Sequence, residues 1–188
     1  YRLFLGRLDI YGESVRSRNG AFGLITGFTL PFENSTALTV AHRYYQKDLQ
    51  SPYGQGFGGA GGGPANQHGY YVGVRHHPAS WLELKGYFDQ YRYPAPRYGE
   101  SRSTTGYDWL FRADVTAGRG VSGYVMARSK RRDTGYGALD EWGRQIERMG
   151  HAARTSYRTH LEYVLNSKFR LRTRGELVLS RAPEGAGE

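Results

Sequence analysis

Carboxylates are the first candidates for chemistry in this chain, because two of them held close together can act as general acid and general base. Within segments of alternating polarity the candidates are Glu83, Asp89, Asp108, Asp114 and Glu162. Basic residues occupy the same kind of alternating position, namely Arg75, Lys85, Arg112 and Arg158. We therefore expect the carboxylates to form ion pairs with these residues rather than a catalytic pair.

The other residue types that carry chemistry lack a suitable setting. His76 and His77 are adjacent, so on a strand their side chains point to opposite faces and do not converge on one metal ion. No serine lies in the strand–turn–helix setting of a nucleophile elbow. The glycine-rich segment 56–64 is not followed by the Gly-Lys-Ser/Thr of a phosphate-binding loop. We expect a protein that is not an enzyme and that has no cofactor and no metal site.

The segment 168–181, KFRLRTRGELVLSR, shows the pattern that dominates the chain. Its charged positions are Lys168, Arg170, Arg172, Arg174 and Glu176, and its apolar positions are Phe169, Leu171, Leu177 and Leu179. Because alternate side chains of a strand point to opposite faces, one face of this strand is apolar and the other is densely charged.

Composition narrows the class of protein. The 188 residues carry a formal charge of +9, 14% are aromatic, and cysteine is absent. A strongly basic chain favours nucleic acid or an anionic surface as its partner. No apolar run approaches the roughly 18–20 residues of a membrane-spanning helix. A transmembrane β-barrel remains compatible with the mean hydropathy of −0.67, because its strands alternate between apolar and polar residues.

Period-two alternation recurs along the whole chain and predicts about nine antiparallel strands. The predicted strands are 7–17, 20–31, 36–46, 69–78, 81–92, 106–116, 120–131, 153–165 and 168–180. One segment, 138–150, fits a helix better, because Leu139, Trp142, Ile146 and Met149 would share one helical face.

The lengths of the predicted connections also alternate. Short turns are expected at 31–35, 78–80, 117–120 and 166–167, and long loops at 47–67, 93–105 and 131–152. Only the connection at 17–21 is short where a long one is expected. Outer-membrane barrels place short turns at one end and long loops at the other, and they gather aromatic residues near the strand ends. We therefore expect the long loops to lie together at one end of the sheet.

The two faces predict a barrel with a polar interior. Many apolar-face positions are small, such as Gly86, Ala113, Gly123 and Ala127, whereas the core of a soluble β-domain needs bulky residues. We expect the following charged residues to face a lumen: Glu13, Arg43, Arg75, Glu83, Lys85, Asp89, Arg112, Asp114, Arg128, Lys130, Arg158, Glu162, Lys168, Arg170, Arg172, Arg174 and Glu176. We expect the following to face lipid: Phe22, Leu24, Phe28, Leu38, Val40, Leu82, Leu84, Phe88, Trp109, Phe111, Leu161, Phe169, Leu171 and Leu177.

Several spaced signatures carry a family resemblance. They are YGES (11–14), AHRYYQKDLQSPYGQGF (41–57), NQHGYYVGV (66–74), YFDQYRYP (87–94) and GYDWLFRAD (106–114). The chain resembles, over about residues 8–180, a family of Gram-negative outer-membrane β-barrels. Longer members of that family carry upstream helix–hairpin–helix modules like those of DNA-uptake proteins. The resemblance implies an outer-membrane location, and this chain contains no helix–hairpin–helix segment.

These observations predict an all-β, antiparallel up-and-down transmembrane β-barrel at 1–181, followed by a tail at 182–188. With an odd number of predicted strands, we expect the C-terminal portion of a larger barrel and an unclosed sheet. The expected partners are the lipid bilayer and other subunits of an outer-membrane assembly. The expected function is a channel or the membrane anchor of such an assembly. A DNA-binding or DNA-translocating membrane protein and a soluble basic all-β binding domain are the alternatives.

Overall fold

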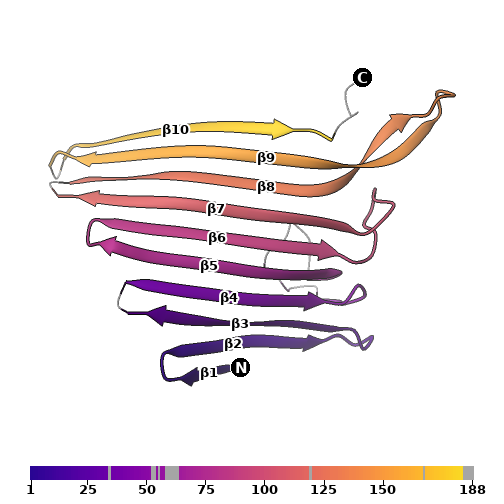
Figure 1. The fold of residues 1–188 in the computed structure, drawn as a ribbon, viewed down its shortest axis with the longest axis horizontal. Helices are drawn as coiled ribbons and strands as arrows, with labels where there is room; N and C mark the ends of the chain where they lie inside the picture. Colours follow the sequence, from indigo (N-terminus) through magenta and orange to yellow (C-terminus); the bar gives the residue numbers. More distant parts are fainter. Residues whose placement is uncertain are drawn as a thin grey trace.

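The computed structural model is a single antiparallel sheet of ten strands, and it describes residues 1–33, 35–51, 54, 56–57, 64–118, 120–166 and 168–183. Each strand pairs with its neighbours in the sequence, from β1 at one edge to β10 at the other (Figure 1). The strands are β1 (Arg2–Leu5), β2 (Leu8–Arg16), β3 (Phe22–Phe32), β4 (Thr36–Tyr45), β5 (Gln67–Ala79), β6 (Leu82–Tyr93), β7 (Thr104–Ala117), β8 (Val121–Leu139), β9 (Gln145–Val164) and β10 (Arg170–Arg181). The all-β, up-and-down prediction is therefore confirmed.

The nine predicted strands correspond to β2 through β10, and β1 is the tenth strand that the sequence pattern missed. β1 is only four residues long, too short to show a period. It turns directly into β2 at Gly6, whose φ of 60° lies in the left-handed region that glycine adopts readily.

The predicted helix at 138–150 is wrong, and so is the long loop predicted at 131–152. β8 continues to Leu139 and β9 begins at Gln145, so these residues form the tip of a long hairpin arm. At the tip, Asp140 Oδ1 accepts hydrogen bonds from the amides of Trp142 and Arg144 at 2.9 and 2.8 Å. Gly143 has a φ of 75°. The hydrogen bonds of Asp140 and the positive φ of Gly143 form a turn that closes a hairpin. The residues whose apolar spacing favoured a helix therefore lie on two antiparallel strands and the turn between them.

Short turns and longer connections lie at opposite ends of the sheet, as the alternation of their lengths predicts. The short turns after β3, β5, β7 and β9 lie at one end of the sheet, together with the turn after β1 (Figure 1). The described parts of connection 46–66 and connection 94–103 adjoin the opposite end, with 17–21 and the tip of the β8–β9 arm. We call this second end the loop end.

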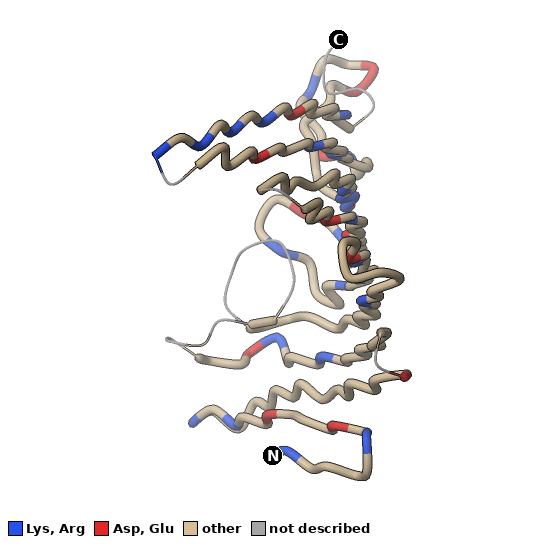
Figure 2. The backbone as a smooth tube through the Cα atoms, turned by 90° about the vertical axis from the view of Figure 1, so that its left-hand side faces the viewer, with Lys and Arg blue, Asp and Glu red and all other residues tan. Residues whose placement is uncertain are grey.

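The sheet is curved and open. Seen from the side, its first and last strands bend toward the same side, and the two termini lie at opposite edges (Figure 2). β1 and β10 do not pair with each other. The expectation of an unclosed sheet is therefore confirmed, whereas the count of nine strands is corrected to ten.

Little of this sheet is packed into an apolar core. The buried hydrophobic cluster contains only Ala21, Tyr45 and Leu49 among the described residues, and Val15 and Ala65 pack against it. It lies at the loop end, where the start of connection 46–66 folds over β2, β3 and β4. Most of the sheet is a single layer, so its two faces meet different surroundings and must be considered separately.

Candidate functional site

The strand register separates the charged and apolar residues along most of the sheet. One face, which we call the inner face, carries Arg43, Asp89 and Asp108. Every charged residue expected to line a lumen falls on this face, except Lys168, which precedes β10. Every residue expected to face lipid falls on the opposite, outer face, except Phe169, which also precedes β10. That the inner face lines a lumen and the outer face contacts lipid stays a prediction.

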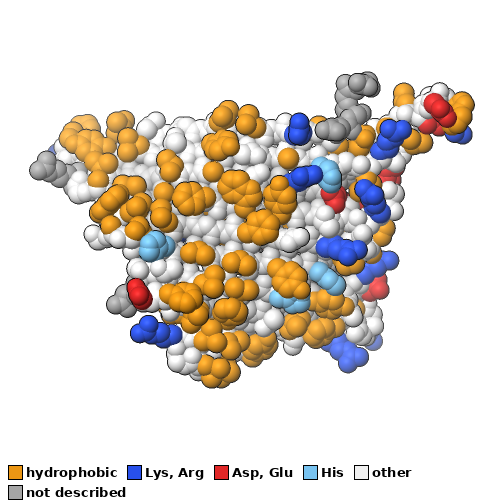
Figure 3. Space-filling view, viewed as in Figure 1, with side chains coloured by type: hydrophobic (Ala, Val, Ile, Leu, Met, Phe, Trp, Pro, Cys, Tyr) orange, Lys and Arg blue, Asp and Glu red, His pale blue; other side chains and the backbone are white. Residues whose placement is uncertain are grey.

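Burial on the two faces is inverted relative to a soluble domain. On the inner face, Arg43 is 1% exposed and Asp89 is 6% exposed. On the outer face, Phe111 is 48% exposed and Val125 is 53% exposed. Figure 3 shows this outer face, with hydrophobic side chains over most of the sheet and Lys and Arg gathered toward the loop end. Around Arg43 and Asp89, charged groups are therefore buried on the inner face, while large apolar groups of the outer face are exposed.

A buried ion pair organises the inner face. The guanidinium of Arg43 on β4 donates to both carboxylate oxygens of Asp89 on β6, at 2.7 and 3.1 Å, and its Nε donates to Gln67 at 3.0 Å. β5 lies between these two strands, and Arg43 crosses it directly above Gly69, where a Cβ would clash with the guanidinium carbon. The glycine therefore provides the space through which Arg43 reaches a carboxylate two strands away. The phenyl ring of Phe57, from connection 46–66, lies 5.8 Å from the guanidinium.

Tyrosine rings cover glycines on the same face. The ring of Tyr91 on β6 lies over Gly106 on β7, where a Cβ would come within 2.6 Å of it. The ring of Tyr71 covers Gly73 in the same way and stacks at 5.5 Å from Tyr87. These contacts fill the space beside the two strand glycines and bury aromatic surface against the backbone, which stabilises the sheet where side chains are missing.

The candidate acid–base residues are engaged in ion pairs, but only Glu83 and Asp114 pair with cations that the sequence analysis named, which are Lys85 and Arg112. Asp108 accepts from Arg128 at 2.6 Å and lies 3.2 Å from Lys130. Asp114 accepts from Arg112 at 2.5 Å. Each of these carboxylates already has a cationic partner, so the arrangement forms a surface of paired charges.

Two carboxylates pair with the basic row of β10. Glu162 on β9 lies 3.2 Å from Arg170 and 2.9 Å from Arg172. Glu176 lies 2.9 Å from Arg158 and 3.1 Å from Arg174. Arginines outnumber carboxylates in this group, so this part of the inner face remains net basic.

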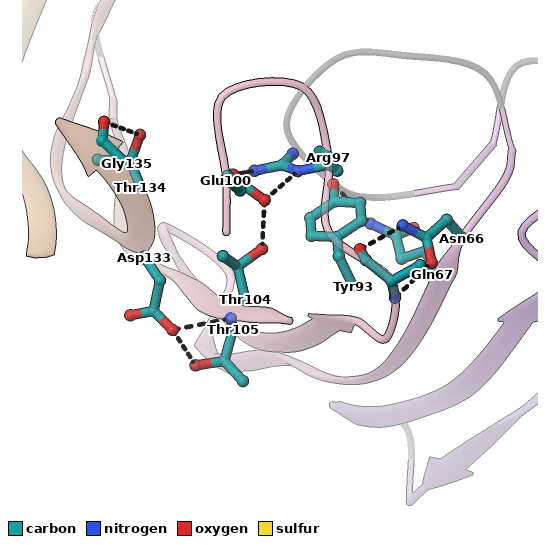
Figure 4. A network of polar contacts seen from close by, with 11 residues as sticks. Asn66, Gln67, Tyr93, Arg97, Glu100, Thr104, Thr105, Asp133, Thr134 and Gly135 are labelled. Atoms are coloured by element: carbon teal, nitrogen blue, oxygen red, sulfur yellow. Dashed lines mark hydrogen bonds and ion pairs between the residues drawn. The ribbon is translucent and has the colours of Figure 1, made fainter. Parts of the chain in front are cut away.

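A second polar network joins the connections at the loop end (Figure 4). Asn66 pairs with the backbone of Ala95 through two hydrogen bonds of 2.8 and 2.9 Å, which ties connection 46–66 to connection 94–103. Arg97 lies 3.9 Å above the ring of Tyr93 and pairs with Glu100.

Glu100 is held as a carboxylate by this network. Burial alone would raise the pKa of Glu100, but hydrogen bonds from Arg97 and from the hydroxyl of Thr104, the latter at 2.9 Å, outweigh it and lower that pKa. These contacts fix the loop-end connections against one another.

The histidines and acidic residues form no metal-binding cluster. Within the described ranges, no group of three or more His, Cys, Asp or Glu residues could hold a metal ion. Nδ1 of His76 hydrogen-bonds Thr36 at 2.7 Å, whereas His77 lies 3.2 Å from Glu83. The adjacent histidines thus have separate partners. The described part of the chain also contains no helix with the length and apolarity needed to cross a membrane.

Comparison with known proteins identifies no relative. No protein-family model, curated protein or solved structure matches this chain. The resemblance to the outer-membrane family therefore stays a prediction, and function is inferred from the two faces of the sheet.

Proposed function

We propose that this chain forms the wall of an outer-membrane β-barrel, with its outer face against lipid and its inner face lining a hydrated lumen. The observation that carries the proposal is the inversion of the two faces. Arg43 and Asp89 are buried on the inner face, while Phe111 and Leu161 stand 48% and 49% exposed on the outer face. Soluble sheets bury their apolar face, whereas transmembrane barrels expose it.

The cost of the opposite orientation supports this assignment. A basic residue facing lipid costs roughly 2–4 kcal/mol near the bilayer midplane. Turning the sheet around would bring Arg112, Arg128 and Arg158 to the lipid side at mid-strand. Their combined cost would be comparable to the whole stability of a typical domain. On the inner face the same residues find carboxylates at Asp114, Asp108 and Glu176.

Strand length fits a membrane. β7 has 14 residues, and at a rise of about 3.3 Å per residue and a tilt near 45° it spans roughly 33 Å along the membrane normal. The hydrocarbon core of a bilayer is about 30 Å thick. Exposed aromatic residues occupy both ends of the outer face, with Tyr70 at the loop end and Tyr163 at the opposite end. Such residues typically lie at the two membrane interfaces.

Both edge strands have an unpaired side, so the sheet could close into a barrel or pair with further strands. β1 and β10 each pair on one side only, and all twelve residues of β10 are exposed. Open edges are not tolerated in lipid, because unpaired backbone groups there cost several kcal/mol each. In the proposed state these edges are therefore paired, with each other or with strands from further protein. This is the basis for expecting other subunits as partners.

Two roles follow from the same wall, a channel or an anchor for an assembly. The wall itself is tested first. The purified chain is mixed with vesicles of zwitterionic lipid, washed with carbonate, and floated on a density gradient. Carbonate-resistant flotation supports the barrel, whereas full solubility of a folded chain without detergent supports the soluble basic all-β domain instead. Conductance in planar bilayers then separates a channel from an anchor.

One observation favours the alternative of DNA binding. Lys130 and Arg154 are directly opposite each other on the inner face, and Arg132 follows in the next row. Arg132 and Arg154 form no ion pair within the described residues. A run of adjacent cations can contact phosphates, and such contacts weaken steeply as salt rises. Binding of single- or double-stranded DNA that falls with salt and is lost in Arg132→Gln/Arg154→Gln supports this role, and salt-independent binding or no binding excludes it.

A further inference from the structure

A row of outer-face residues at the loop end differs from the rest of the apolar surface. Tyr107 on β7 is directly opposite Arg131 on β8, Arg131 is opposite Ala153 on β9, and Ala153 is opposite Arg181 on β10. Two arginines thus flank a small residue on the face that is otherwise largely apolar. The side chains of Arg131 and Arg181 are exposed, and neither forms an ion pair with any residue that the structure describes.

These residues surround a hollow. It has a volume of about 410 Å³ and is lined by Tyr107, Arg131, Ala153 and Arg181 together with Met149 and His151 from the base of the β8–β9 arm. The hollow exists because Ala153 leaves room between the two arginines. Guanidinium groups thus border a space that also has an aromatic and a thioether wall.

The histidine of the hollow is oriented by a carboxylate. Nδ1 of His151 lies 2.6 Å from Asp133. Asp133 also accepts hydrogen bonds of 2.9 and 2.8 Å from the backbone N–H and the hydroxyl of Thr105, so its position is fixed from β7. With Nδ1 engaged by Asp133, Nε2 is the ring nitrogen left to contact a ligand.

We propose that this hollow binds the phosphate group of a membrane-lipid headgroup; the proposal rests on the outer face contacting lipid. Arg131 and Arg181 supply planar donors that match phosphate oxygens, and an arginine–phosphate pair is a strong charge-assisted interaction. Tyr107 and Met149 offer apolar surface to the glycerol and first acyl carbons. The location suits a headgroup, because basic and aromatic residues beside an apolar band mark the membrane interface.

The test is a titration of the whole chain in neutral maltoside micelles, in which calorimetry measures the binding of each titrant. The titrants are short-chain phosphatidic acid, the matching phosphatidylcholine, whose phosphate is neutralised by its own choline, and inorganic phosphate. The variant Arg131→Gln/Arg181→Gln removes both arginines of the hollow. The matched control, Arg16→Gln/Arg92→Gln, removes the same charge from exposed outer-face positions at the loop end outside the hollow. A second variant, Ala153→Leu, fills the hollow without changing charge.

We expect phosphatidic acid to bind the unmodified chain and to bind Arg131→Gln/Arg181→Gln at least roughly tenfold more weakly. Ala153→Leu should weaken binding similarly, the control by less than about twofold, and phosphatidylcholine should bind at least roughly tenfold more weakly than phosphatidic acid. An equal loss in the control would assign binding to diffuse charge and overturn the site. Inorganic phosphate binding as tightly as phosphatidic acid, or no binding of phosphatidic acid, would overturn it too.

The outcomes for the site and for the barrel are separable. Titration in micelles needs no bilayer insertion, and flotation with zwitterionic vesicles needs no anionic headgroup. A chain that floats but does not bind phosphatidic acid rejects only the headgroup site, whereas a chain that fails to float rejects the membrane wall itself.

Discussion

Replacing Asp89 with asparagine probes the buried ion pair on the inner face. The substitution keeps the size of the side chain and removes the negative charge that balances Arg43. The Arg43 side chain is 1% exposed and the Asp89 side chain 8% exposed, so the arginine cannot recover its hydration without opening the network. Gln67, at 3.0 Å from Nε, remains as a neutral acceptor.

The expected loss of stability in Asp89→Asn depends on how the charge of Arg43 is compensated once Asp89 is neutral. Removing one partner of a buried ion pair typically costs about 3–5 kcal/mol, because the other charge stays buried without compensation. The amide oxygen of the introduced asparagine and the oxygen of Gln67 can still accept hydrogen bonds from Arg43. We therefore expect Asp89→Asn to lower the free energy of unfolding by about 3 kcal/mol, at the lower end of that range.

The assay is urea unfolding followed by tryptophan fluorescence in one fixed micelle or vesicle composition. The matched control is Glu176→Gln, which also neutralises a carboxylate facing arginines on the same face. Its partners Arg158 and Arg174 are 29% and 53% exposed, so the expected loss of stability is much smaller than that of Asp89→Asn, because solvent screens exposed ion pairs. A double variant, Arg43→Met/Asp89→Leu, removes both charges.

The double variant decides between loss of charge balance and loss of packing. It leaves no buried charge unpaired, so we expect it to be less destabilised than Asp89→Asn. Two results would refute the reasoning: an Asp89→Asn chain within about 1 kcal/mol of the unmodified chain, or a double variant that is less stable than the single one.

Three further perturbations test separate parts of the fold. Gly106→Ala places a Cβ within 2.6 Å of the Tyr91 ring, so we expect a loss of about 1–3 kcal/mol in the same urea assay. Hydrogen bonds from Arg97 and Thr104 outweigh burial and lower the pKa of Glu100 in the folded chain. The contribution of Glu100 to stability is therefore fully present above its ordinary pKa of 4.5. That contribution is lost as the pH falls through the lowered pKa. Urea unfolding across that pH range should show a decline in stability that is smaller in Glu100→Gln, because Asp114 and Asp133, whose pKa values are also lowered, still contribute to it. Gly143→Val forces a β-branched residue to a φ of 75° and should speed amide hydrogen exchange in the β8–β9 arm by roughly tenfold.

Each of these three has a matched control. Gly86→Ala meets only the Leu110 carbonyl oxygen at 3.4 Å and the Phe111 ring at 3.9 Å, so its loss of stability should be smaller than that of Gly106→Ala. Glu141→Gln, at an exposed position of the arm, should leave the decline at low pH unchanged. At Gly137 a Cβ meets nothing within 4 Å and φ is not positive, so Gly137→Val should leave exchange in the arm slow. A control that behaves like its test variant contradicts the structural reason given.

Strand positions and faces were predictable because a strand alternates its side chains with a period of two. That period places Arg172 and Leu171 on opposite faces wherever the strand begins or ends. The helix predicted around Trp142 failed for a physical reason. Four apolar residues at helical spacing do not determine the conformation of the residues between them. Between them, Asp140 and Gly143 form a turn, which the pattern of hydrophobic residues does not predict.

The pairing of charges was not predictable from the sequence. A register argument places Arg43 beside its direct neighbours on β3 and β5, which are Ile25 and Gly69. Its partner is instead Asp89, two strands away, and it is reached because Gly69 has no side chain. The signal was present as a strand glycine on a polar face, but which side chain it makes room for depends on the residues that lie beside it in three dimensions.

The most direct test of the membrane wall is a spin-label scan of β7 in vesicles, which the cysteine-free chain allows without background labelling. Single cysteines are introduced in turn at positions 107 to 115, and collisions with oxygen, which concentrates in lipid, are compared with collisions with a polar nickel reagent. The proposed wall predicts a period of two, with high oxygen access at Trp109, Phe111 and Ala113 and high nickel access at Leu110 and Arg112. Nickel access without alternation along β7, or high oxygen access at Arg112 instead of Phe111, would contradict a sheet whose apolar face contacts lipid.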